Sequence, residues 1–320
     1  ELVLRAFPQW LALARPGKPG RFQLRQGRGA MLRDGDPLLS AEALAVARVD
    51  TGQRDTLIQL ALRLSNQQLM ELARREGSWV EHVAWDENLG RIRATRRLRL
   101  GELIVQEKAQ SSVAPELCQN LLLKRFQLGG TLDQLPWSDS SEQLRRRLVL
   151  AHLHLGAPWP NRQRELLLKQ AGDWLPPCLM NCLSLSEINP SDLEEALWGN
   201  LDWPQRQRLD QLLPLRFAIP SGRSAKLHYE EDEVVLTVKL QEMFGAMKGP
   251  HVLEGEMPVT VELLSPAGRP LQRTQDLESF WAGSYEQVRR EMRGRYPRHP
   301  WPDDPVSAKP TAWTKRRHPT

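Results

Sequence analysis

Cysteine is scarce in this 320-residue chain, and long apolar runs are lacking. The three cysteines, Cys118, Cys178 and Cys182, form no CxxC pair and have no histidine at ligand spacing, which argues against a disulfide framework and a metal site. No apolar run approaches the roughly 18 residues of a membrane helix, and the start has no basic segment followed by an apolar core. The sequence therefore predicts a cytoplasmic protein that enters no membrane.

Catalytic motifs are also missing. Gly17-Lys18 has Ala12 where a P-loop needs its first glycine, so nothing is predicted to hold nucleotide phosphates. His152 and His154 are two apart in a helical region and face different directions. The four consecutive acids of residues 230–233 are more typical of a solvated turn than of a catalytic site. We predict no catalytic residue, metal or cofactor in this chain, which leaves open whether it acts within an enzyme.

Charge is present in abundance and unevenly placed. Lys and Arg number 44 against 39 Asp and Glu, and all but nine of these bases are Arg, whose planar fork matches phosphates and stacks on bases. Residues 286–320 hold nine basic and four acidic residues, so the rest of the chain is balanced. The chain also begins at Glu1 within an amphipathic stretch, so we expect a fragment or a trimmed chain.

The periodicity of apolar residues predicts a multidomain α+β protein. Residues 1–20 are expected to end a preceding region or to form a linker. From 21 to 110 the pattern is that of short strands interrupted by one helix capped by Asn66, as in a small OB-like or SH3-like barrel. In one such strand Ile58, Leu60, Leu62 and Leu64 are expected to form a half-buried face.

The pattern changes twice further along. Residues 111–214 have helical spacing cut by Gly and Pro, which predicts an all-helical domain. Residues 215–305 alternate strands with a helix that begins at Asp276 and ends at Gly294, which predicts a mixed α+β domain. Residues 306–320 are expected to be a disordered basic tail.

One basic run lies on a predicted strand at residues 91–100. Side chains alternate between the two faces of a strand, so Ile92, Ala94, Leu98 and Leu100 are predicted to point inward. The exposed face then carries a row of arginines, Arg91, Arg93, Arg97 and Arg99. Such a row suits a single-stranded nucleic acid. The alternative is a surface strand whose arginines pair with acids of neighbouring strands, for which Glu81, Glu102 and Glu107 are the candidates.

A second basic run follows the last predicted helix. It contains Arg293, Arg295, Tyr296 and Arg298, and the three prolines of residues 297–302 favour an extended path around Trp301. Arginines for phosphates and aromatic rings for stacking are the combination of single-strand binders. Two other roles stay open: the arginines favour the helix C-terminus through its dipole, and Trp301 packs as an anchor.

These C-terminal residues also carry a family resemblance. The stretches at 263–272, 274–277 and 280–281, with Gly-Arg-Tyr-Pro-Arg-His-Pro-Trp-Pro-Asp-Asp-Pro at 294–305, closely resemble the end of the bacterial HrpB family of ATP-dependent helicases, in the DEAH/RHA group. Shorter matches run along the chain, among them residues 27–30, 83–86, 96–98, 135–137, 143–145 and 219–222. The resemblance implies an OB-fold at about 20–110 followed by a C-terminal extension.

The resemblance implies the accessory, nucleic-acid-binding half of an RNA helicase. In the family, two RecA-like motor domains precede this region and use ATP and Mg²⁺, and none of their motifs occurs here. The implied partners are single-stranded RNA or DNA and RecA-like domains in the same polypeptide. The alternative is a free-standing protein-interaction module without catalytic activity.

Overall fold

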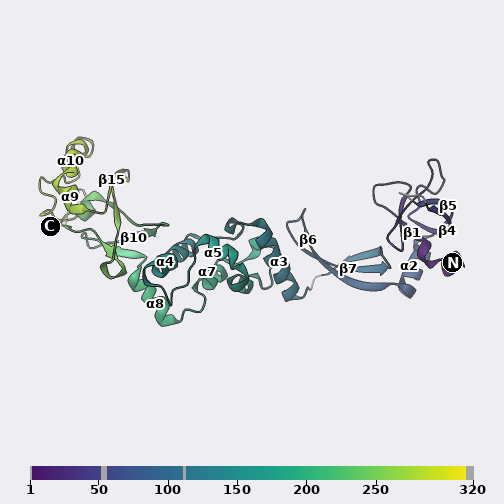
Figure 1. Ribbon diagram of the computed structural model, residues 1–320. Helices are drawn as coiled ribbons and strands as arrows, with labels where there is room; N and C mark the ends of the chain where they lie inside the picture. The colour runs from purple at the N-terminus through teal and green to yellow at the C-terminus, as the bar shows by residue number, and fades with distance from the viewer. Residues whose placement is uncertain (1, 52–55, 111–112, 315–320) are drawn as a thin grey trace. The chain divides into compact units, whose positions relative to one another are not determined.

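The computed structural model describes residues 2–51, 56–110 and 113–314, which form two compact units. The first consists of Glu1–Leu122 with Met180–Ser184, and the second of Leu123–Leu179 with Leu185–Thr320. A small barrel, a helical middle region and a mixed C-terminal sheet follow one another along the chain (Figure 1). The predicted multidomain α+β class is confirmed. The helical region and the C-terminal sheet, which the sequence divides at residue 214, fall within one unit.

A closed barrel with strand order β1-β2-β3-β5-β4 lies near the start of the chain, after α1 (Leu2–Ala6) and the short helix η1 (Pro8–Trp10). Its strands are β1 (Leu11–Ala14), β2 (Arg21–Leu24), β3 (Gly29–Met31), β4 (Ala43–Thr51) and β5 (Thr56–Arg63). Phe22, Leu24 and Leu44 are buried in its core. The sequence assigned residues 1–20 to a preceding region or linker, but β1 pairs with both β2 and β4 and is needed to close the barrel.

The predicted inward face of β5 is only partly correct. Ile58 is buried, but Leu60 and Leu62 are each 59% exposed, and Ala61 packs against the barrel core instead. The pairing of β4 with β5 is irregular on either side of Arg48, which disturbs the alternation of inward residues. The pairing of β3 with β5 also extends only to Leu57, because β3 has three residues.

The next three strands lie outside the barrel. β6 (Ser78–Asp86), β7 (Arg91–Leu100) and β8 (Leu103–Ala109) form a separate antiparallel sheet with β7 in the centre. The sequence placed these strands in one barrel of residues 21–110, but they pair with one another and the barrel closes without them. Local patterns predict strands, whereas pairing depends on contacts distant in sequence, and this is why the prediction missed the division.

The helix α2 (Asn66–Glu76) packs this sheet against the barrel. Its Leu69 and Leu72 share an apolar cluster with Leu98 of β7 and Leu11 of β1. The helix begins one residue earlier than predicted, because Ser65 is the N-cap: its hydroxyl accepts a hydrogen bond from the Gln68 amide at 3.2 Å.

Helices form the middle region, as predicted. They are α3 (Pro115–Gly129), α4 (Asp139–Leu155), α5 (Arg164–Lys169), α6 (Ala171–Trp174), α7 (Pro190–Trp198) and α8 (Trp203–Leu212), with short 3-10 turns η2 (Leu132–Gln134), η3 (Pro176–Leu179) and η4 (Leu185–Glu187). The helix α4 ends at Gly156, whose φ of 69° is readily adopted only by glycine. Its residues 141, 143–145 and 147–151 are buried, including polar ones.

A five-stranded sheet with order β15-β14-β11-β10-β9 follows. Its strands are β9 (Arg216–Ala218), β10 (Ser224–Tyr229), β11 (Val234–Lys239), β14 (Thr260–Leu264) and β15 (Pro270–Thr274). Only β11 and β14 are parallel. The short segments between them are η5 (Leu240–Met243), β12 (His251–Val252), η6 (Leu253–Gly255) and β13 (Met257–Pro258).

The helix predicted from Asp276 to Gly294 is two helices, α9 (Leu277–Ala282) and α10 (Ser284–Arg295). Asp276 is the N-cap of α9 as expected, and Gly283 breaks the run with φ of −124° and ψ of −83°. The aromatic rings of Phe280, Trp281 and Tyr285 pack together across the break.

The segment after residue 305 also differs from the prediction of a disordered tail. The Thr311 amide donates to the Gln241 carbonyl at 2.9 Å, and Thr311 is buried. Residues 306–314 therefore pack on the C-terminal sheet region, and residues 315–320 lie outside the described residues. The prediction failed because this Pro-rich segment has no regular spacing of apolar residues. It packs through individual contacts, such as that of Thr311, which a periodic pattern does not reveal.

Candidate nucleic-acid interface

The predicted arginine row lies on β7, the central strand of the β6–β8 sheet (Figure 1). Ile92, Ala94, Leu98 and Leu100 are buried as predicted. Arg91 and Arg93 are exposed, and Arg97 and Arg99 are half-buried. The alternation predicted for β7 is confirmed, because it needs only the two-residue period of an extended strand.

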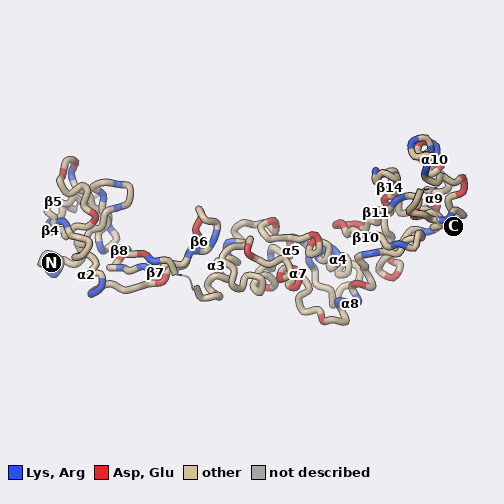
Figure 2. The backbone as a smooth tube through the Cα atoms, turned by 180° about the vertical axis from the view of Figure 1, so that it is seen from behind, with Lys and Arg blue, Asp and Glu red and all other residues tan. Residues whose placement is uncertain are grey.

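Carboxylates neutralise much of this row. Arg97 Nε lies 2.6 Å from Glu107 Oε2, and Arg99 Nη2 lies 2.8 Å from Glu102 Oε2. Arg93 lies 3.6 Å from Glu107 and 3.9 Å from Asp86. Acidic and basic residues accordingly lie close together along β7 and β8 (Figure 2). The alternative interpretation, a surface strand whose arginines are paired with acids, is therefore correct for Arg97 and Arg99. Their partners, Glu107 and Glu102, are two of the three acids that it named.

The opposite face of the sheet carries three neighbouring side chains that were not predicted from the sequence. Trp79, Arg96 and Lys108 form this Trp79 group. Arg96 Cζ lies 5.6 Å and Lys108 Nζ 5.2 Å from the centroid of the Trp79 ring. The register pairs Arg96 with Lys108 on β8. Cation–π contacts of this kind contribute about 0.5 to 1 kcal/mol at exposed sites. One feature of the sequence could have revealed this group. Arg96 is a charged residue at an inward position of the strand, between Ala94 and Leu98.

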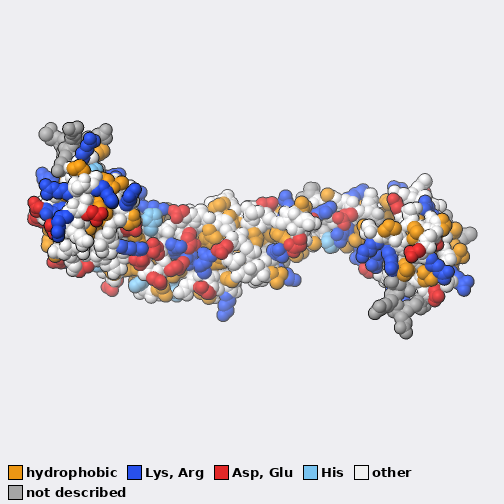
Figure 3. Space-filling model, turned by 90° about the horizontal axis from the view of Figure 1, so that it is seen from above, with side chains coloured by type: hydrophobic (Ala, Val, Ile, Leu, Met, Phe, Trp, Pro, Cys, Tyr) orange, Lys and Arg blue, Asp and Glu red, His pale blue; other side chains and the backbone are white. Residues whose placement is uncertain are grey.

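The second predicted group lies at the end of α10. Arg293 and Arg298 are exposed and have no hydrogen-bond or ion-pair partner among the described residues. Arg295 lies 3.9 Å from Glu291, one turn earlier on the helix. Tyr296 is half-buried, and its ring meets that of His299 edge-on at 6.3 Å. Lys and Arg side chains gather over this C-terminal part of the chain at the left of Figure 3.

His299 adds no charge to this group near neutral pH. Burial, helped by the positive charge of Lys239, lowers the pKa of His299 below its ordinary value. A depressed pKa leaves the imidazole neutral at pH 7. The positive charge beside Tyr296 therefore comes from arginine.

Trp301 is a packing anchor. Its side chain is only 8% exposed, and its indole Nε1 donates to the Tyr296 carbonyl at 3.0 Å. The Tyr285 hydroxyl donates to the Pro302 carbonyl at 2.9 Å, and Arg289 forms an ion pair with Asp303. Of the two roles considered for Trp301, packing is confirmed, because a buried ring offers no face to a base.

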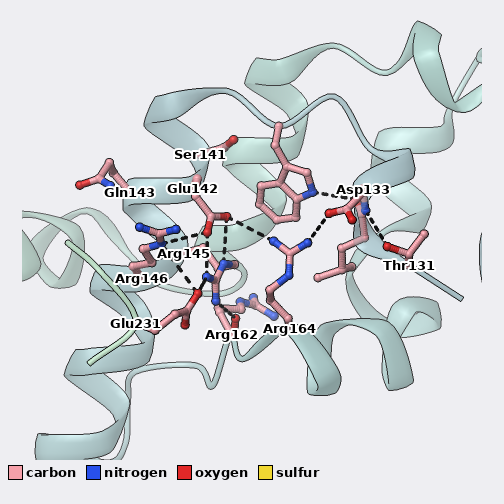
Figure 4. A network of polar contacts seen from close by, with 12 residues as sticks. Thr131, Asp133, Ser141, Glu142, Gln143, Arg145, Arg146, Arg162, Arg164 and Glu231 are labelled. Carbon is pink, nitrogen blue, oxygen red and sulfur yellow. Dashed lines mark hydrogen bonds and ion pairs between the residues drawn. The ribbon is translucent and has the colours of Figure 1, made fainter. Parts of the chain in front are cut away.

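A buried polar network around α4 holds the helical region to the C-terminal sheet (Figure 4). Arg145 is fully buried and donates to Glu142 Oε1 at 2.8 Å, and it also pairs with Glu231. The Gln143 side chain pairs with the backbone of Tyr229, at 3.1 Å to its carbonyl and 2.8 Å to its amide. Glu231, predicted to lie in a solvated turn, is therefore part of this network.

Electrostatics favour the charged state of this network. Burial alone would raise the pKa of Glu142, but the hydrogen bonds and positive charges of Arg145 and Arg146 outweigh it and hold that pKa below its ordinary value. The unit that carries α10 is thus supported by ion pairs formed far apart in sequence.

Other kinds of site receive no support from the described ranges. Within them no helix is long and apolar enough to cross a membrane. No group of three or more His, Cys, Asp or Glu side chains gathers there as metal ligands would. A cavity of about 730 Å³ lies in the helical region beside Trp174 and Trp198, and its lining contains none of the predicted site residues.

Comparison with known proteins decides the family. Residues 174–305 match the family described as "ATP-dependent helicase C-terminal", and residues 78–110 match the "ATP-dependent RNA helicase HrpB, connector region". The two matches together cover just over half of the chain. This chain belongs to the HrpB family. It is similar to the C-terminal region of DEAH/RHA helicases of that family.

The similarity to individual HrpB proteins extends along nearly the whole chain. The ATP-dependent RNA helicase HrpB of Escherichia coli (strain K12) is 38% identical over an alignment of 319 residues, which covers 98% of this chain and 39% of that protein. The crystal structure of the E. coli DExH-box NTPase HrpB has a TM-score of 0.59 at 38% identity, with 98% of this chain and 39% of that one covered. That of the E. coli DEAH/RHA helicase HrpB has a TM-score of 0.51 at 35% identity, covering 94% and 38%.

The HrpB connector coincides with the β6–β8 sheet. Its match, residues 78–110, begins at the first residue of β6 and ends one residue after β8. The predicted row on β7 and the Trp79 group therefore both belong to the connector of the HrpB family. The barrel strands lie outside this matched region.

Proposed function

We propose that this chain is an accessory region of an ATP-dependent RNA helicase and binds single-stranded RNA. The observation that carries the proposal is a set of exposed cations without carboxylate partners among the described residues. Arg96 and Lys108 lie beside the Trp79 ring on the connector, and Arg293 and Arg298 flank Tyr296 in the sequence of the C-terminal part. Unpaired cations near aromatic side chains suit a phosphate backbone with exposed bases. Membership of the HrpB family supports this choice of ligand.

ATP hydrolysis is not assigned to these 320 residues. The sequence contains no glycine-rich loop followed by Lys and Ser or Thr, which is needed to cradle the β- and γ-phosphates. We propose that ATP and Mg²⁺ act in RecA-like domains of the same polypeptide. The chain spans about 39% of the length of its E. coli relative.

Fluorescence anisotropy with a labelled oligouridine, measured between about 50 and 300 mM salt, tests the proposal. We expect log K to fall linearly with log salt, by about 0.7 per phosphate contact. The double variant Arg293→Ala and Arg298→Ala should lower that slope. Arg208→Ala is the matched control, because Arg208 is exposed but paired with Glu254.

A flat salt dependence would contradict RNA binding. Affinity no greater than that of an unrelated protein of equal charge would instead favour the interaction module. In that case the 730 Å³ cavity beside Trp174 and Trp198 would be the next surface to examine.

A further inference from the structure

The Trp79 group lies at an unusual position in the connector sheet. On the same face of β7, Ile92 and Ala94 precede Arg96 and Leu98 follows it, and all three apolar residues are buried. Trp79 itself is paired with Leu98 by register but remains 38% exposed. A large aromatic ring and a cation are therefore open to solvent beside buried residues of the same strand face.

The two cations have no competing partners. Arg96 and Lys108 form no hydrogen bond or ion pair with any described residue, and their one contact of this kind is with the Trp79 ring. Glu81 is the cross-strand neighbour of Arg96, yet it accepts a hydrogen bond from Gln110 at 3.0 Å. On the opposite face, by contrast, Arg97 and Arg99 lie within 2.8 Å of carboxylates.

Two like charges stand side by side here. Arg96 and Lys108 are directly opposite each other on adjacent antiparallel strands, where like charges repel. An anion placed between or beyond them would relieve this repulsion. The register of the three strands brings these side chains together before a ligand binds, so only the ends of the two cations must move.

We propose that Trp79, Arg96 and Lys108 form a subsite for one nucleotide of single-stranded RNA. The base stacks on the indole, and the two cations turn from the ring to the flanking phosphates. A nucleotide unit combines the two features this group can recognise, an aromatic plane and adjacent anions. The choice of ligand rests on the proposed function; the location of the subsite rests on the connector geometry alone.

The test uses the full chain, a labelled oligouridine of about 12 nucleotides, and the same strand length without bases. Arg96→Ala with Lys108→Ala should lower the salt slope by about 1.4, since two phosphate contacts are lost. The matched control, Arg93→Ala with Arg97→Ala, removes two cations from the opposite face of the same strand. We expect it to lower the slope by less than about 0.7, because carboxylates already neutralise that face.

Trp79 has its own readout. Trp79→Ala should weaken oligouridine binding by about 5- to 150-fold with little change of slope, because stacking releases no ions. It should leave binding of the strand without bases unchanged, a selectivity that a merely structural role would not produce. Trp79→Phe keeps a stacking ring and should retain most of the affinity, so it answers the question even if Trp79→Ala fails to fold.

The outcomes separate the two proposals. If the wild-type chain does not bind oligouridine, the proposed function fails and the subsite fails with it. If the wild type binds but the Arg96 and Lys108 double variant binds as the wild type does, only the subsite is overturned. A larger loss of slope for the Arg93 and Arg97 variant, or equal losses from Trp79→Ala on strands with and without bases, would also overturn it.

Discussion

Replacing Arg145 with alanine should destabilise the unit that contains α4 and the C-terminal sheet. The Arg145 side chain is fully buried and joins three chain segments: Glu142 on its own helix, the Arg162 carbonyl at 3.2 Å, and Glu231 between β10 and β11. The substitution removes every one of these contacts. It also leaves Glu142, which is only 19% exposed, without its closest cation.

The size of the effect follows from what remains after the change. Removing one partner of a buried ion pair costs about 3 to 5 kcal/mol, because a desolvated charge is left behind. Here Arg146 still lies 2.9 Å from Glu142, and Glu231 is 53% exposed and can be hydrated. We therefore expect the lower end of that range, about 3 kcal/mol, which corresponds to a fall of about 6 to 12 °C in melting temperature for a unit of this size.

Arg164→Ala is the matched control. Arg164 belongs to the same network and pairs with Asp133, but both side chains are more exposed, at 37% and 77%. Such a pair contributes at most about 1 kcal/mol. Thermal unfolding followed by circular dichroism on the whole chain compares the two variants. Equal losses of stability would refute the argument that burial makes the Arg145 contacts costly to remove.

Three further outcomes are expected. Trp301→Ala should lower the free energy of unfolding by about 3 to 5 kcal/mol while the folded fraction keeps its RNA affinity; an unchanged melting curve with weakened binding would contradict the anchor role. The pKa of Glu142 is depressed in the folded chain, so the stability that Glu142 contributes is present above its unfolded pKa of about 4.3 and is lost as the pH falls through the folded value. Urea titrations should therefore show that the difference in free energy of unfolding between wild type and Arg145→Ala becomes smaller in acid. The isolated chain should release no phosphate from ATP in a colorimetric assay, with or without RNA, and RNA-stimulated release from a pure preparation would refute this.

Local patterns in the sequence predicted the elements well. The two-residue period of residues 91–100 predicted the buried apolar residues of β7, and the predicted start of a helix at Asp276 coincides with the N-cap of α9. Pairing was less accessible, because it depends on contacts between distant segments. β1 closes a barrel that the sequence analysis began at residue 21, and the irregular pairing around Arg48 turns Leu60 and Leu62 outward.

The charge of the candidate site was difficult to predict for the same reason, because it also depends on contacts between distant segments. A sequence displays the number of arginines in a run, but the charge available to a ligand depends on which of them already have partners. Glu107 lies ten positions after Arg97 in the sequence, and it neutralises Arg97 only because β8 folds back beside β7 in the observed register. Before that pairing is known, the acids and bases of residues 91–107 cannot be matched.

The same reasoning explains why Arg96 escaped notice. Alternation assigns it to the inward set of β7, and an inward arginine suggests a buried ion pair. The structure instead leaves that position uncovered, with Lys108 opposite and Trp79 beside it. A cation at an apolar position, without a carboxylate to neutralise it and with an exposed aromatic ring within reach, gains little from folding alone. A bound ligand would supply the missing negative charge, and we therefore propose this face of the connector sheet, rather than the face that carries the arginine row, as the place to look for a bound nucleotide.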